Sequence, residues 1–242
     1  MMPRRARPLN HTLESTVAVT TPKVAICNDP KWFGQLYRKA AYEDVLLKAQ
    51  KKGFHVVPEE FHDLFELGSL LYEGPWVAER YVAIKDFIEN HAEEMDPVVR
   101  NIILGAKKFT AADLFEAQYH RENLMAEIKR RFDKYDAILV PTAPTFPTLQ
   151  EVAREPVKEP SLLGTYTNFV NFMGWAALAI PSGFSGDGLP FGVTFISSAW
   201  DEPKLLTLGR TLTMGDEVRL GATSRIYRQL DKISDQETTF NS

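Results

Sequence analysis

One apolar segment constrains the fold of this chain more than any other part of its sequence. Residues 136–141 read DAILVP, a near-continuous apolar run that is typical of a strand covered on both faces. The run ends in the loop PTAPTFPT, where three prolines prevent the chain from continuing a helix or a strand ladder. The sequence therefore predicts a strand inside a sheet.

A strand–helix–strand pattern precedes this segment. KVAIC (23–27) and FHVVP (54–58) are predicted strands, and residues 34–52 between them are a predicted helix. The apolar stripe expected to face the core of this helix recurs every four residues, at Tyr37, Ala41, Val45 and Ala49. The alternation indicates an α/β layer.

The remaining elements are mostly predicted helices. They cover 60–90 with a break near Gly74-Pro75, Thr110 to just before Tyr135, 164–178, and the segment after Asp201. Two further predicted strands, ALAIPSGF and LPFGVTFIS, are joined by Gly186-Asp187-Gly188, which tolerates the positive φ of a hairpin turn.

The composition argues against several classes of function. Lys and Arg number 28 against 32 Asp and Glu, a formal net charge of −4, so the basic surplus of a nucleic-acid-binding protein is missing. No apolar run approaches the roughly 18 residues of a membrane-spanning helix, and we expect a cytoplasmic protein. The five histidines are scattered without metal-ligand spacing, and the single cysteine, Cys27, is expected to be buried and unreactive.

Both ends of the chain are expected to lack regular structure. Residues 1–21 carry three arginines before the first acid, but two prolines interrupt any amphipathic helix, which favours an irregular leader over a targeting segment. Residues 217–242 are expected to form a loose polar tail. One domain is expected over 22–216.

Several segments resemble one family. YDAILVPTAP, TNFVNFMGWAALAIPSGF and GLPFGVTFISSAWDEPKLL are similar in order and spacing to the second half of the amidase signature domain, over about residues 22–216. The segment LLYEGPWVAERY resembles the allophanate hydrolase branch, which hydrolyses urea-1-carboxylate in urea degradation. The resemblance implies an α/β fold with a mixed sheet flanked by helices, and no metal or organic cofactor.

The resemblance also implies two substrate-binding residues, Tyr72 and Arg80, because the family binds its substrate with a tyrosine and an arginine at these motif positions. Urea-1-carboxylate is a small planar anion, and a guanidinium meets a carboxylate with two hydrogen bonds. A structural interpretation stays open, in which Tyr72 belongs to the core and Arg80 pairs with Glu73 or Glu79 on a solvated helix face.

The groups that would break an amide bond are not found in the similar region. In the family they are a serine in a Gly/Ser-rich loop, a second serine on an unusual cis peptide, and a lysine, all before the half that this chain resembles. The residues before Pro22 contain no lysine. The serines of FISSAW (Ser197, Ser198) and of PSGFSGDG (Ser182, Ser185) are interpreted as structural. We therefore expect no catalytic residue in these 242 residues.

Three functions follow as alternatives. The first is the substrate-side portion of an allophanate hydrolase, inactive alone and completed by the missing N-terminal half or by a homodimer mate. The second is a non-catalytic remnant that binds an amidase or a small anion, and the third is an amidase for another small amide. Strands such as AILVP and LPFGVTF are expected to expose bare backbone without that half, giving a chain that is poorly soluble or needs a partner.

Overall fold

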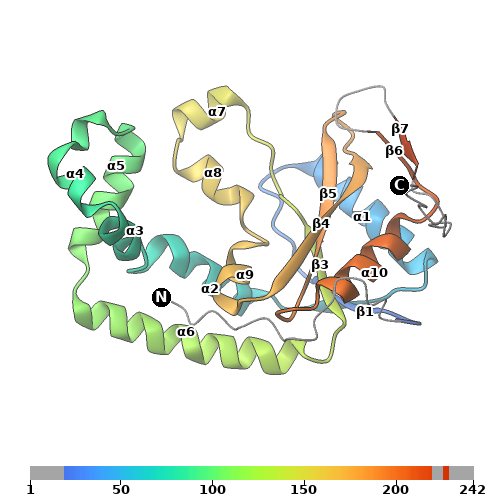
Figure 1. The fold of residues 1–242 in the computed structure, drawn as a ribbon. Coiled ribbons are helices and arrows are strands. Elements are labelled where there is room, and N and C mark those ends of the chain that lie inside the picture. The colour runs from blue at the N-terminus through green and yellow to red at the C-terminus, as the bar shows by residue number, and fades with distance from the viewer. Residues whose placement is uncertain (1–18, 220–225, 229–242) are drawn as a thin grey trace, which may run out of the picture.

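The computed structural model describes residues 19–219 and 226–228, so the expected leader lies almost wholly outside the described residues. Its centre is a five-stranded sheet in the order β2-β1-β3-β5-β4 (Figure 1). β1, β2 and β3 are parallel, whereas β5 runs antiparallel to both β3 and β4. The predicted mixed sheet is confirmed, with strands β1 (Lys23–Cys27), β2 (His55–Glu59), β3 (Ala137–Pro141), β4 (Ala176–Phe184) and β5 (Pro190–Ser197).

Helices cover both faces of this sheet. The α-helices are α1 (Leu36–Lys51), α2 (His62–Glu73), α3 (Val77–Ala83), α4 (Lys85–Asn90), α5 (Pro97–Leu104), α6 (Ala111–Phe132), α7 (Leu149–Arg154), α8 (Lys158–Leu163), α9 (Asn168–Met173) and α10 (Glu202–Thr213). Two 3₁₀ turns, η1 (Ala92–Glu94) and η2 (Gly105–Lys108), flank α5. The short helices α3, α4 and α5 lie away from the sheet, and the long α6 runs back from them to β3 (Figure 1).

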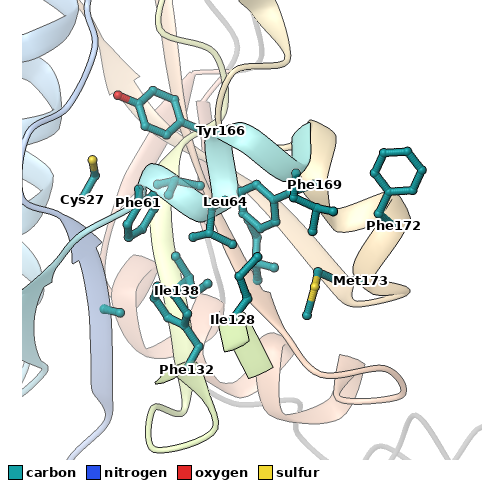
Figure 2. Packing of buried hydrophobic residues seen from close by; sticks show 14 of the residues in the cluster. Cys27, Phe61, Leu64, Ile128, Phe132, Ile138, Tyr166, Phe169, Phe172 and Met173 are labelled. Atoms are coloured by element: carbon teal, nitrogen blue, oxygen red, sulfur yellow. The ribbon is translucent and has the colours of Figure 1, made fainter. Parts of the chain in front are cut away.

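The core is divided by the sheet into two clusters, and β3 contributes to both. Ile138 and Val140 pack with α2, α6 and α9 on one face, where Leu64, Ile128 and Phe169 are fully buried (Figure 2). Leu139 packs on the opposite face with α1 and α10. All five residues of β3 are buried, which confirms the predicted interior strand.

The hairpin of β4 and β5 changes one sequence-based expectation. β5 is bonded to β3 on one side and to β4 on the other, so neither AILVP nor LPFGVTF exposes bare backbone, and that expectation is wrong for these two strands. The outer strands are β2 and β4, each of which pairs on one side only among the described residues.

Local rules explain where several helices begin and end. Thr110 and Asp113 form the predicted capping box of α6, with the Asp113 carboxylate accepting from both the main-chain N–H and the hydroxyl of Thr110. The helix predicted over 164–178 is shorter, because Gly174 ends α9 with a φ of 60° and β4 begins at Ala176.

The buried stripe of α1 is shifted by one residue from the prediction. Val45 and Ala49 are buried as expected, but Arg38 and Tyr42 take the inner positions, and Tyr37 is exposed. At the other end of the chain, residues expected in a loose tail include β6 (Glu217–Arg219) and β7 (Ile226–Arg228), which pair with each other as a two-stranded sheet.

Candidate substrate-binding site

A groove begins where the parallel strands end. A cavity of about 860 Å³ lies at the carboxyl ends of β1 and β2, lined by Cys27 and Asn28 after one strand and Glu60 after the other. Helix α2 forms its wall through Phe61 and Phe65. Ligands of open α/β sheets bind at this edge, because the loops that follow the strands converge there.

A second cavity continues along α2 toward the predicted site residues. It has a volume of about 310 Å³ and is lined by Tyr72 from the last turn of α2, Phe33 from the loop after β1, and Asn168 from α9. Lys31, Phe65 and Ser69 line both cavities. We refer to the two together as the α2 groove.

Tyr72 and Arg80 lie beside each other at the end of this groove. Gly74 and Pro75 end α2 after Glu73, and α3 then carries Arg80 back toward the ring. The Arg80 guanidinium carbon is 5.9 Å from the centroid of the Tyr72 ring, within the range of a cation–π contact. Two residues that the sequence separates by one break in a helical region are thereby brought together.

Neither residue has the structural role that the alternative interpretation gave it. The Tyr72 side chain is 51% exposed, so it is not part of the core. Glu73 and Glu79 do not pair with Arg80, and in the part of the chain that the structure describes no carboxylate lies within ion-pairing distance of its guanidinium. Both side chains therefore keep their hydrogen-bonding groups available at the surface.

Lys31 is a groove residue that the sequence did not reveal. Its ammonium nitrogen lies 4.5 Å from the centroid of the Phe65 ring, and among the described residues it has no ion-pair partner. Its main-chain oxygen accepts a hydrogen bond of 3.1 Å from the fully buried Tyr166. Phe33, two residues on, has a φ of 49°, an uncommon value for a bulky residue. A lysine in a loop carries no periodic pattern, and only its position after β1 pointed to this edge.

Two asparagines near the site differ in their surroundings. Asn168 lines the groove and lies so close to Gly164 that a Cβ on that glycine would be 2.2 Å from the Asn168 side-chain oxygen. Asn171, one turn along the same helix, is exposed. The close approach to Gly164 agrees with a role for Asn168 in supporting the preceding loop.

The serines and the cysteine have structural surroundings, as predicted. Ser197 donates hydrogen bonds of 3.0 Å and 2.7 Å to the Asp136 main-chain oxygen and the Asp201 carboxylate. Ser185 donates to Asp187 and to the Leu189 oxygen within the β4–β5 turn. Cys27 is buried, and that burial raises the pKa of its thiol to about 11, so the reactive thiolate is scarce near neutral pH.

Neither a metal cluster nor a membrane-spanning helix is found in the described part of the chain. Within 19–219 and 226–228, no group of three or more His, Cys, Asp or Glu side chains is arranged to hold a metal ion. Over the same residues, no helix combines the length and the apolar character needed to cross a membrane.

The fold and the groove define an amidase, and comparison with known proteins supports this. The family model for amidases matches residues 6–206, so the chain belongs to the amidase family. Saccharomyces cerevisiae urea amidolyase is 41% identical over 196 residues, which are 80% of this chain and 10% of that protein. A Kluyveromyces lactis allophanate hydrolase superposes with a TM-score of 0.83 at 37% identity, over 89% of this chain and 37% of the other.

A more distant relative shows the breadth of the family. A glutamyl-tRNA(Gln) amidotransferase of Psychrobacter is 37% identical, but only over 46% of this chain and 23% of the relative. The predicted resemblance to amidases of the allophanate hydrolase branch, and with it to urea degradation, is confirmed by the longer matches. The chain spans about a tenth of the urea amidolyases and about a third of the allophanate hydrolase that it matches.

Proposed function

We propose that this chain is the substrate-binding portion of an amidohydrolase that acts on urea-1-carboxylate, with Tyr72 and Arg80 as the residues that hold the substrate. The observation that carries the proposal is the pairing of the Arg80 guanidinium with the Tyr72 ring at the end of the α2 groove. The likeness to allophanate hydrolase over most of the chain supports the choice of substrate.

The chemistry of the substrate suits these two side chains. The carboxylate of urea-1-carboxylate presents two oxygens in one plane, which the planar guanidinium of Arg80 can meet with parallel hydrogen bonds. Arginine stays charged at any relevant pH, so this recognition does not depend on titration of the protein. The Tyr72 hydroxyl can donate to or accept from the urea end, and its ring limits the freedom of the Arg80 side chain.

The bond-breaking step is proposed to need residues from outside these 242 residues. Amide hydrolysis requires an activated nucleophile and donors aimed at the oxyanion. The hydroxyls of Ser185 and Ser197 are engaged with carboxylates of the fold, and Cys27 is held as a buried thiol. We therefore expect this chain alone to bind the anion in the cytoplasm without hydrolysing it.

The proposal is tested by equilibrium binding to the full chain. Malonamate replaces the bridging N–H of urea-1-carboxylate by a methylene and keeps both ends, so it is a stable ligand for titration. Arg80→Ala is expected to weaken binding about tenfold or more, since a charge-assisted hydrogen-bond pair is lost. Arg130→Ala, which removes an exposed arginine of α6, is the matched control and is expected to leave binding unchanged.

Two further measurements separate the alternatives. Neutral malonamide is expected to bind much more weakly than malonamate, and equal binding would favour an amidase for another amide. Ammonia release from urea-1-carboxylate by the purified chain, above a blank without protein, would contradict the expected lack of turnover. Malonamate affinity that is equal in the wild type and Arg80→Ala would overturn the proposed binding residues.

A further inference from the structure

Arg38 is a buried cation whose charge is not balanced by the described residues. Its side chain is 3% exposed, and its Nη2 and Nε atoms donate to the Ala143 main-chain oxygen at 3.1 Å and 3.4 Å. The remaining nitrogen, Nη1, is buried without a hydrogen-bond partner. In the described ranges no carboxylate comes within ion-pairing distance of it. Such a group is costly unless an acceptor reaches it.

A second buried donor lies in the same loop. The hydroxyl of Thr145, two residues after Ala143, is also buried without a partner. Arg38 itself is enclosed by aromatic rings, with its guanidinium carbon 5.7 Å from the centroid of Phe146 and 5.2 Å from that of Phe191. The loop after β3 therefore presents two unsatisfied polar groups that point to an oxygen acceptor from another segment.

Large apolar side chains are exposed around this arginine. Leu36 and Tyr37 precede it on α1 with 73% and 61% of their surfaces exposed, and Phe146 is 51% exposed. Tyr37 packs against the turn between β4 and β5, since a Cβ on Gly186 would lie 2.6 Å from its ring. We call Leu36, Tyr37, Phe146 and the buried Arg38 among them the Arg38 surface. Exposed apolar groups around an unpaired charge are typical of an interface that lacks its partner.

The Arg38 surface adjoins the α2 groove. Phe33, which lines the groove beside Tyr72, is five residues before Arg38 in the segment that leads from β1 into α1. A polypeptide seated on the Arg38 surface would therefore border the proposed substrate site.

We propose that the Arg38 surface docks the portion of an allophanate-hydrolase-type chain that these 242 residues do not span, with an oxygen acceptor of that portion placed on Arg38 Nη1. This chain covers 37% of the Kluyveromyces lactis allophanate hydrolase that it matches, so a large remainder of such a chain is the occupant to be accommodated. The inference rests on the proposed function, because the same remainder would bring the nucleophile to the substrate held by Tyr72 and Arg80.

The test is complex formation with that remainder. The full 242-residue chain is co-expressed with the remainder of the Kluyveromyces lactis allophanate hydrolase chain, and the complex is followed by size-exclusion chromatography over a dilution series. Leu36→Asp and Phe146→Asp are each expected to weaken the complex about tenfold or more, as for central interface residues. Arg38→Met removes the unpaired donor at similar bulk and is expected to have an effect of the same size.

The controls place the same charge on equally exposed side chains elsewhere. Val82 of α3 is 70% exposed and Phe115 of α6 is 55% exposed, so Val82→Asp and Phe115→Asp match Leu36→Asp and Phe146→Asp. Both are expected to leave the dissociation constant within about twofold. If Arg38→Met does not fold, the two pairs of surface variants decide the result.

The outcomes separate this inference from the proposed function. Absence of a complex with the wild-type chain, or equal weakening by the control variants, would overturn the Arg38 surface as a docking site. Malonamate binding by the chain alone is unaffected by either result. Conversely, Arg80→Ala is expected to lose malonamate affinity and keep the complex, so loss of the first with retention of the second supports both proposals independently.

Discussion

The hydroxyl of Tyr42 donates a hydrogen bond of 2.7 Å to the main-chain oxygen of Leu139, which joins α1 to the central strand β3. Strand pairing between β1 and β3 extends only to Ala25 and Ile138, so the tyrosine supplies a donor next to the point where the parallel ladder stops. Burial raises the pKa of this hydroxyl, which keeps it protonated and able to donate.

Tyr42→Phe is expected to lower the free energy of unfolding by about 1–3 kcal/mol, because the buried Leu139 oxygen loses its side-chain donor while the ring packing is retained. Urea denaturation followed by circular dichroism measures this change. Tyr37→Phe alters an exposed tyrosine of the same helix and is expected to change stability by less than about 0.5 kcal/mol. Equal effects of the two substitutions would show that the hydrogen bond contributes nothing specific.

Lys31→Gln is expected to weaken malonamate binding about two- to fivefold, and to reduce the dependence of binding on salt, because an exposed ammonium on the groove wall attracts the anion through solvent. Lys51→Gln removes the same charge from the last turn of α1, outside the lining of the groove, and serves as control. Titrations at two ionic strengths provide both readouts. A loss with Lys51→Gln as large as with Lys31→Gln would reduce the effect to net charge.

The stability of the chain is expected to fall in acid partly through its helix caps. Hydrogen bonds from the Thr110 main-chain N–H and hydroxyl hold the pKa of Asp113 below its usual value, and Thr148 does the same for Glu151. A lowered pKa in the folded state means that the contribution is complete above the unfolded-state pKa and is lost as the pH falls through the folded-state value. Asp113→Asn is expected to flatten the decline in melting temperature below about pH 4. An unchanged slope in this variant would assign the acid sensitivity to other carboxylates.

Elements that depend on local chemistry were predictable from the sequence, and this explains the success with β3, the β4–β5 hairpin and the α6 capping box. Arg38 was not, because helical periodicity treats a charged residue as a surface residue, whereas Ala143, more than a hundred positions away, supplies the acceptor that buries it. The end of α9 was missed because the left-handed conformation of Gly174 is decided by the strand that must begin two residues later.

The candidate site shows the same division. The sequence could predict Tyr72 and Arg80 through their resemblance to a family motif, and a helical break near Gly74-Pro75, but not that this break brings the two side chains together. Lys31 reaches the groove through a loop whose main-chain oxygen is held by Tyr166, far away in the chain, and that contact has no counterpart in local sequence.

The break between α2 and α3 is expected to be essential to the site. A Cβ on Gly74 would lie 2.6 Å from the Leu70 main-chain oxygen and 3.0 Å from the Trp76 ring, so Gly74→Ala forces the start of α3 to move. We expect this to shift Arg80 from Tyr72 and to weaken malonamate binding severalfold, with a loss of stability of about 1–3 kcal/mol from the displaced contacts. Gly105→Ala is the matched control, since a Cβ there meets no atom within 4 Å, and it is expected to leave both quantities nearly unchanged. If Gly74→Ala bound malonamate as the wild type does while losing stability, Arg80 would not depend on this break for its position.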